Sequence, residues 1–458
     1  MSGQKIWSGR FSSGTGSLME AYSTSIHVDK VLFDADIRVN KAWASALGRI
    51  GVYNADQVQQ VRDALDAIAV DYEQGKLEFS PADEDIHSAN ERWLTARLGD
   101  IGARIHTGRS RNDQVITDLK IYLRERVSEL DEAVKSLQAV LIDLADDHRE
   151  IIFPGQTHLR QAQPVSFAHY ILALFFQLQR NRERLRDYRI RMNKMPLGSG
   201  AIAGAAFDID RVQLADELGF DAPTENSYDA TADRDFVLEL LYICGQIMQH
   251  LSRLSEDFII WSCEPFAWLE VGEAYSTGSS MMPQKKNPDS LELVRGKSAR
   301  VIGNLTTGMT LLKGVPTAYV RDLQEDKEPV FDSLNQTLQS ILIVKGVFET
   351  LTVNRQKMLR ALDPALYATD LADYLVKKGV AFRNAHSIVG SVVAHVEKKS
   401  MTLDTLPLDH YRLFSDKFDE DIYDLFNPVS SVSKRNLAGG TGPESIASQL
   451  EMARDLLH

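Results

Sequence analysis

The segment GSSMMPQKKNP, from Gly278 to Pro288, combines the groups that a proton-transfer site needs. Ser279 and Ser280 supply hydroxyls directly after a glycine, and Lys285 with its neighbouring lysine supplies positive charge. Glycine permits a flexible loop, or a concave run of backbone N–H groups that holds an oxyanion. A surface linker would account for Gly-Ser-Ser, but not for two methionines and two prolines among the polar groups. The segment is therefore a candidate for a loop that holds an oxyanion.

A second polar segment, PGQTHLRQAQP, runs from Pro154 to Pro164 and contains His158. The intrinsic pKa of an imidazole, near ~6.5, suits proton transfer at neutral pH. A lone histidine is more often structural, but this one stands in a polar loop between helical stretches. We predict that His158 is functional.

A third segment, IHTGRSRNDQ, places Arg109, Arg111 and Asn112 at the start of a long helix. Helix N-termini attract anions, and arginine forks match carboxylates. An ordinary helix cap with solvated arginines explains this segment equally well. Two further polar stretches are SPADEDIHSANE, which contains His87, and AYVRDLQEDKEP, which by itself is typical of a solvated helix start.

Long helices must position these loops. No glycine or proline interrupts the chain between Gly108 and Pro154, and apolar residues recur there at steps of three and four. Further helices are expected from near Pro164, over 233–261, from Pro288 with Asn287 as its N-cap, and over 329–359. Strand alternation is scarce. The pattern predicts an all-α protein whose long helices pack side by side as a bundle.

Shorter segments flank the long helices on both sides. We expect a small N-terminal helical domain over 1–106, a central bundle with the active-site loops over 107–360, and a small C-terminal helical domain over 361–458. Several helix faces are apolar, YILALFF at 170–176 most of all, which suggests burial between subunits.

Composition restricts the class of protein. The 458 residues carry a net charge of −13, which disfavours binding to nucleic acid or an anionic membrane. Two cysteines in apolar helical sequence, Cys244 and Cys263, indicate buried thiols in a reducing compartment.

The first residues lack a signal-peptide core, and the longest uncharged stretch, 161–179, makes a weak membrane span. A cytoplasmic protein is expected. Phosphate-loop, dinucleotide and zinc-ligand motifs are absent from the sequence.

Taken together, the polar loops resemble those of the fumarase/aspartase superfamily, whose shared loop has Gly-Ser-Ser followed by Met-Pro, a lysine and Asn-Pro. Within it, the chain is most similar to the argininosuccinate lyases. The segments that carry this resemblance are WSGRF, HTGRSRNDQ, THLRQAQP, MPQKKNPDSLELVRGK and ATDLADYLVKKGV.

The resemblance implies an all-α fold of three domains, with a central bundle of five long helices. It implies a homotetramer with a twenty-helix core and active sites shared between subunits. The implied reaction is the reversible elimination of argininosuccinate to arginine and fumarate through a stabilised carbanion, the last step of arginine biosynthesis. No cofactor and no metal are expected.

The resemblance also assigns residues. It makes His158 and Ser279 the catalytic pair, with Ser279 favoured near the carbanion and His158 on the leaving-group side, although the opposite assignment stays open. The expected substrate-binding residues are Ser25, His87, Arg109, Asn112, Thr157, Lys285, Asn287, Tyr319, Gln324 and Lys327.

Two alternatives have different signatures. Another lyase of the superfamily, such as adenylosuccinate lyase, would need a phosphate site and a different loop after Met-Pro. A delta-crystallin-like structural protein would share the fold with or without activity. The complete set of catalytic residues favours an active enzyme.

Overall fold

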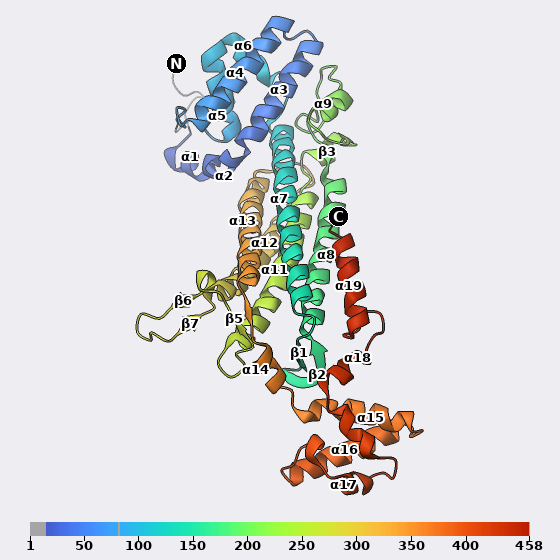
Figure 1. The fold of residues 1–458 in the computed structure, drawn as a ribbon. Coiled ribbons are helices and arrows are strands. Elements are labelled where there is room, and N and C mark those ends of the chain that lie inside the picture. Colours follow the sequence, from blue (N-terminus) through green and yellow to red (C-terminus); the bar gives the residue numbers. More distant parts are fainter. Residues whose placement is uncertain (1–14, 81–82, 458) are drawn as a thin grey trace. The chain divides into compact units, whose positions relative to one another are not determined.

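The computed structural model describes residues 15–80 and 83–457, so the WSGRF segment at 7–11 lies outside the described residues. The chain is predominantly helical, and its few strands are short (Figure 1). The predicted all-α class is confirmed. The chain divides into two compact units. Unit 1 consists of residues 1–131, 183–245 and 299–337; unit 2 consists of 132–182, 246–298 and 338–458.

Five long helices are present in the described part of the chain: α7 (Arg111–Asp147), α8 (Phe167–Met192), α11 (Asp235–Ser262), α12 (Asp289–Leu312) and α13 (Lys327–Glu349). Each contributes one end to unit 1 and the other end to unit 2. None of the described helices is long and apolar enough to cross a membrane. The two units are defined by contacts, and the domain boundaries at 106/107 and 360/361 stay a prediction.

In unit 1, α3 (Phe33–Arg49), α4 (Ala55–Glu73) and α5 (Ile86–Leu98) pack together. Asn54 caps α4 through a reciprocal capping box with Gln57. The ring of Phe33 stacks on Tyr72 at 3.9 Å between centroids. The shorter elements of this unit are α1 (Ser17–Ser23), α2 (Ile26–Asp29), η2 (Lys30–Leu32), α6 (Asp100–Ala103), η3 (Arg104–His106), β3 (Lys194–Met195), α9 (Arg211–Glu217), β4 (Ala222–Pro223), α10 (Ser227–Ala230) and η5 (Arg321–Asp326).

The long helices approach closely within unit 1. Gly308 of α12 lies against Leu238 and Leu241 of α11, where an added Cβ would come within 2.9 Å of each leucine. Tyr122 of α7 meets Phe331 of α13 edge to face, with ring centroids 5.1 Å apart. These contacts hold the ends of the long helices that border the polar segments of this unit.

In unit 2, aromatic side chains fill the space between the helices. Phe258 of α11 packs edge to face on Phe348 of α13, with ring centroids 4.9 Å apart. Tyr170 of α8 donates a hydrogen bond to Asp257 of α11 at 2.7 Å. The YILALFF segment, 170–176, is therefore mostly buried inside this unit and leaves little apolar surface for a second subunit, contrary to the expectation.

The C-terminal part of unit 2 has its own small core, which includes Leu371, Leu375, Tyr411 and Phe418. The described helices after α13 are α14 (Arg355–Arg360), η6 (Pro364–Tyr367), α15 (Ala368–Lys377), α16 (Phe382–Lys398), η7 (Leu403–Thr405), α17 (Leu408–Arg412), η8 (Glu420–Leu425), α18 (Pro428–Ser433) and α19 (Pro443–Asp455). Cys244 is buried, Cys263 is partly buried, and both are free thiols.

Three predicted helix boundaries are wrong. Pro164 does not begin a helix: it lies in β2 (Arg160–Ser166) and pairs with Pro154 of β1 (Ile152–Thr157), so α8 begins at Phe167. Asn287 does not cap α12, because it lies in β7 (Lys286–Asn287), and the Pro288 carbonyl accepts the first helical hydrogen bonds instead. The helix expected over 329–359 ends at Glu349, since β8 (Thr352–Val353) turns away to pair with β5 (Leu269–Glu270).

Candidate active site

The serine loop, residues 279–285, joins β6 (Thr277–Gly278) to β7 in a short hairpin that stands out from α12 (Figure 1). Its base is fixed by the Ser290 hydroxyl, which donates to the Tyr275 carbonyl at 2.7 Å, and by Lys286, which pairs with Glu270 at 2.8 Å. Lys285 is exposed and Asn287 is half-buried. The loop thus has an anchored base and a solvent-exposed tip.

The Ser279 hydroxyl faces backbone donors of its own loop. Its Oγ accepts hydrogen bonds from the N–H of Met282 at 3.0 Å and of Met281 at 3.3 Å. Such donors stabilise an alkoxide more than a neutral hydroxyl, because hydrogen bonds to a charged acceptor are stronger. The arrangement favours the deprotonated serine that a proton abstraction needs.

The histidine turn connects β1 to β2. Thr157 pairs with Arg160, so His158 and Leu159 are the two central residues of a two-residue hairpin turn. Both have left-handed backbone, with φ of 55° and 57°, the conformation of a type I′ turn. Thr157 and His158 are exposed, so the imidazole is presented to solvent at the end of the β1–β2 ribbon.

The arginine segment of unit 1 lies at the start of α7. The Asp113 carboxylate accepts hydrogen bonds from the backbone N–H groups of Ser110 at 3.1 Å, Gly198 at 3.0 Å and Gly200 at 2.8 Å. It thereby ties the arginine segment to the glycine-rich loop at 197–201. The side-chain amide of Asn112 reaches the same loop through the Ala201 carbonyl, at 3.4 Å.

Ser25 lies beside the start of α5. Its hydroxyl donates to Asp29 Oδ2 at 2.6 Å, and Asp29 Oδ1 accepts from the Ile86 N–H at 3.0 Å. Both Ser25 and Asp29 are buried. Asp29 therefore links Ser25, a predicted substrate-binding residue, to the start of the helix that carries His87.

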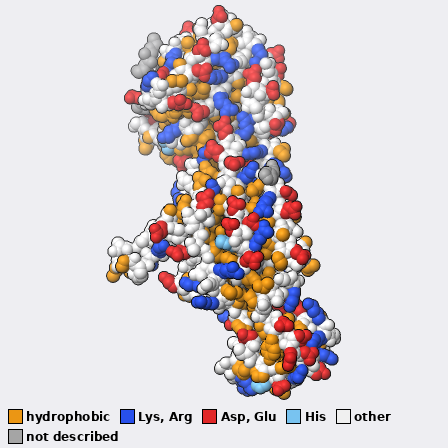
Figure 2. Space-filling view, in the orientation of Figure 1, with side chains coloured by type: hydrophobic (Ala, Val, Ile, Leu, Met, Phe, Trp, Pro, Cys, Tyr) orange, Lys and Arg blue, Asp and Glu red, His pale blue; other side chains and the backbone are white. Residues whose placement is uncertain are grey.

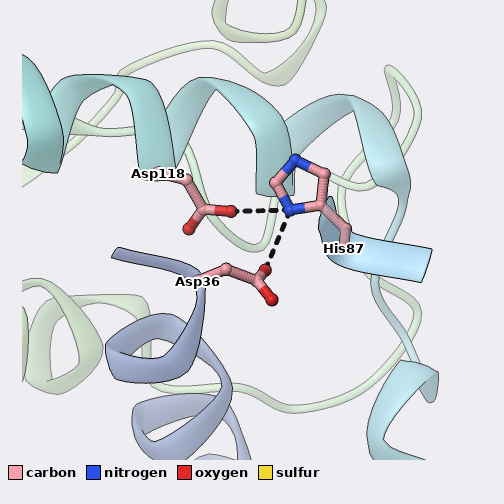
Figure 3. A group of neighbouring side chains, drawn as sticks. All are labelled: Asp36, His87 and Asp118. Carbon is pink, nitrogen blue, oxygen red and sulfur yellow. Dashed lines mark hydrogen bonds and ion pairs between the residues drawn. The ribbon is translucent and has the colours of Figure 1, made fainter. Parts of the chain in front are cut away.

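His87 of α5 lies in a buried acidic cluster with Asp36 of α3 and Asp118 of α7 (Figure 3). Its Nδ1 is 2.9 Å from Asp36 Oδ1 and 3.0 Å from Asp118 Oδ2. Figure 3 shows both carboxylates directed at this single nitrogen. Among the described residues, the opposite nitrogen, Nε2, has no hydrogen-bond partner. A substrate contact of His87 would therefore involve Nε2.

Charge within this cluster is strongly coupled. Burial lowers the pKa of His87, but the carboxylates of Asp36 and Asp118 outweigh it and raise that pKa to about 10. Burial raises the pKa of Asp36, yet attraction to His87 brings it far below its usual range. Burial and repulsion from Asp36 raise the pKa of Asp118 well above its usual range. The three groups therefore titrate as one coupled unit, in which His87 and Asp36 favour their charged forms and Asp118 favours its protonated form.

Asp36 is the centre of a wider network. It accepts hydrogen bonds from the side-chain amides of Asn40 at 2.8 Å, Asn90 at 2.7 Å and Gln114. Asn40 in turn accepts from the buried Arg109 at 2.8 Å. The network links Arg109 and His87, two of the predicted substrate-binding residues, through one carboxylate.

The polar segment AYVRDLQEDKEP, residues 318–329, leads into α13. Tyr319 and Gln324 are half-buried, and the Gln324 amide donates to the Ser23 carbonyl at 3.4 Å. Lys327 is buried, and its ammonium donates to Asp326 Oδ1 at 3.3 Å. Burial raises the pKa of the Tyr319 phenol, so its hydroxyl keeps its proton at neutral pH.

The predicted site residues fall into two groups. Unit 2 contains Thr157, His158, Ser279, Lys285 and Asn287, and unit 1 contains Ser25, His87, Arg109, Asn112, Tyr319, Gln324 and Lys327. Sequence reasoning missed the acids that hold the second group in place. A signal was present for one of them, since Asp36 stands on the otherwise apolar face of α3, four residues before Asn40.

Comparison with known proteins decides the family. The family described as Lyase matches residues 9–303, and the one described as Argininosuccinate lyase C-terminal matches 365–433. The chain is 45% identical to a probable argininosuccinate lyase of Schizosaccharomyces pombe over 100% of this chain and 99% of the relative. The chain belongs to the argininosuccinate lyase family. A second family member, from Geobacillus sp., is 46% identical over 99% of each chain.

The match to the Lyase family supports the fumarase/aspartase superfamily that the loops predicted, and solved structures share the fold. An EDDS lyase variant with bound fumarate superposes with a TM-score of 0.85 at 26% identity, covering 98% of this chain and 91% of the other. The class II fumarase of Schistosoma mansoni, at 16% identity, shares the fold with a TM-score of 0.75 over 91% and 94% of the two chains.

Proposed function

We propose that the chain catalyses the reversible elimination of argininosuccinate to arginine and fumarate. Membership of the argininosuccinate lyase family supports the substrate. The observation that carries the chemistry is the Ser279 hydroxyl, whose Oγ accepts two backbone N–H groups of its own loop. Such donors stabilise the serine oxyanion, which a serine needs in order to act as a base.

In the proposed mechanism, Ser279 removes the proton from the carbon beside a succinyl carboxylate. The electron pair moves into that carboxylate, and Lys285 and Asn287 stabilise the charge as it develops. The carbon–nitrogen bond then breaks to form fumarate. The nitrogen takes the electron pair of that bond, and His158 gives it a proton, so that arginine leaves with a protonated guanidinium. The exposed tip of the serine loop is suited to closing over substrate.

The remaining predicted residues hold the substrate in this proposal. Those of unit 1 present hydroxyl, amide and cationic donors, which match the carboxylates and the guanidino group of argininosuccinate. They are Ser25, His87, Arg109, Asn112, Tyr319, Gln324 and Lys327, and Thr157 of unit 2 adds a hydroxyl beside His158. No metal or cofactor takes part.

We further propose a cytoplasmic homotetramer with active sites shared between subunits. Support comes from α12, which buries only a narrow stripe while Leu293, Ile302 and Met309 are exposed. Leu342 and Ile343 of α13 are exposed as well. Hydrophobic side chains are visible among the charged ones along the long helices (Figure 2). Assembly of four chains through their long helices would bury them.

The test is the ultraviolet absorbance of fumarate released from argininosuccinate by the purified protein. Activity should persist after treatment with a chelator. Adenylosuccinate serves as the second substrate, because the nearest alternative is adenylosuccinate lyase. Cleavage of adenylosuccinate alone would support that alternative, and cleavage of neither substrate by folded protein would support a delta-crystallin-like structural role.

A further inference from the structure

Asp326 lies between two buried cations in unit 1. Arg234, directly before α11, donates through Nε to Asp326 Oδ2, and Lys327 donates through Nζ to Asp326 Oδ1 at 3.3 Å. The side chains of Arg234, Asp326 and Lys327 are 2%, 2% and 5% exposed. One carboxylate is therefore shared by two cations, each using a different oxygen.

The shared carboxylate leaves positive charge uncompensated. Two cations and one anion sum to one surplus positive charge, and a buried charge without a counter-ion is costly. Among the described residues, Asp326 is the one carboxylate in an ion pair with Arg234 or with Lys327. The surplus charge is therefore available to an anion that enters the site.

The charges of Arg234 and Asp326 also act on the phenol of Tyr319. Burial raises the pKa of its phenol, whereas the charges of Arg321 and Arg234 lower it and the charge of Asp326 raises it again. Arg234 and Asp326 thus act on a residue that the proposed function assigns to substrate binding.

We infer that Arg234 is a positioning residue: it engages Asp326 so that Lys327 retains its charge for a carboxylate of the substrate. The inference rests on the proposed function, in which Lys327 contacts argininosuccinate. Without Arg234, Asp326 would pair with Lys327 alone, and the buried pair would be neutral. Substrate binding would weaken, while the chemical step at the serine loop would be untouched.

The test is a set of variants assayed for fumarate release. We expect Arg234→Met to raise KM by about 10- to 100-fold, the effect of losing one charged hydrogen-bonding partner, with kcat changed little. The double variant Arg234→Met with Asp326→Asn removes the neutralising carboxylate as well, and its KM should return to within a few-fold of the wild-type value. Arg234→Lys retains the charge and should lie closer to wild type than Arg234→Met.

Controls separate this inference from a structural role. Arg191→Met removes an exposed arginine that pairs with Glu239 and should leave KM unchanged. Thermal unfolding of each variant identifies those that fold. A double variant whose KM is as high as that of Arg234→Met would overturn the inference. If Arg234→Met does not fold, Arg234→Lys decides: it keeps a cation beside Asp326 and should leave KM within a few-fold of the wild-type value, and a large increase in a folded Arg234→Lys variant would overturn the inference.

The variant Lys327→Met tests the underlying proposal separately. A raised KM in Lys327→Met, combined with no rescue in the double variant, would leave the proposed substrate contact intact and reject only the role of Arg234. An unchanged KM in folded Lys327→Met would reject the contact itself, and the role of Arg234 with it.

Discussion

The imidazole of His87 and the carboxylate of Asp36 lie 2.9 Å apart with both side chains buried. This pair joins α5 to α3, and Asp118 extends it to α7. Asp36 also accepts hydrogen bonds from three side-chain amides, so these donors stabilise its negative charge together with His87. The pair therefore holds together the part of unit 1 that carries Arg109.

Replacement of Asp36 by asparagine should destabilise the protein strongly. The substitution removes one of the two carboxylates beside His87 and the charged acceptor of three side-chain amides, and loss of a buried ion-pair partner costs about 3–5 kcal/mol. Urea unfolding of Asp36→Asn measures it. Asp66→Asn is the matched control, because Asp66 pairs with Lys41 at an exposed position and should contribute less than about 1 kcal/mol. Equal stabilities of the two variants would show that the buried cluster contributes little.

Acid should destabilise the protein through His106. Burial first, and then the charges of Arg109 and Arg111, lower the pKa of this imidazole to about 4 in the folded chain. The unfolded chain takes up the proton near pH 6.5 and the folded chain only near pH 4, so the contribution to stability is present above 6.5 and is lost as the pH falls toward 4. The expected slope is at most about 1.4 kcal/mol per pH unit.

The variant His106→Gln isolates this contribution. Its unfolding free energy should fall less than that of the wild type over the same pH window, since glutamine does not titrate there. Denaturant unfolding at several pH values provides the comparison. Parallel curves for the two proteins would assign the acid sensitivity to other groups.

The turn beside His158 offers a stabilising substitution. Leu159 has a φ of 57° and is 73% exposed, so its side chain adds left-handed strain and little packing. Leu159→Gly should raise the free energy of unfolding by up to about 1 kcal/mol, because glycine adopts this conformation without a Cβ clash. Leu159→Ala keeps the Cβ and should give no such gain. Thermal unfolding of both variants checks this, and equal melting temperatures would argue against strain at the turn.

Loss of either catalytic group should reduce turnover without unfolding the protein. General acid–base groups contribute about 10²–10⁴ in rate, so Ser279→Ala and His158→Asn should each lower kcat by at least that range. Ser280→Ala is the matched control, since it removes the neighbouring hydroxyl of the same loop. Near-normal kcat in a folded Ser279→Ala or His158→Asn variant would exclude that residue from the mechanism.

The long helices could be predicted because their signal is local: apolar residues at steps of three and four over a stretch without glycine or proline. The hairpin around His158 could not, since Pro154 and Pro164 face each other only once two strands pair, and no glycine marks the left-handed turn. Asp36 is marked only by its place on a largely apolar helix face, and Asp326 has ordinary local sequence. Their importance depends on partners 51 and 92 residues away, His87 and Arg234, which only the fold brings together.

The proposed sharing of active sites is testable with two inactive variants, His158→Asn and Ser279→Ala. Each chain still carries the residue that the other lacks. If the histidine turn and the serine loop of one site come from different chains, random one-to-one mixing should restore about a quarter of the sites, because two independent choices must each supply the intact residue. If both came from one chain, every site would keep one defect.

The experiment is to denature the two variants together, refold them, and compare fumarate release with that of each variant refolded alone. Mass measurement confirms that mixed tetramers have formed. The exposed apolar residues of α12 and α13 make such assembly an expected outcome of refolding, since they are left uncovered within the single chain. Mixed tetramers no more active than the separately refolded variants would reject shared sites, and they would require His158 and Ser279 of one chain to serve the same site.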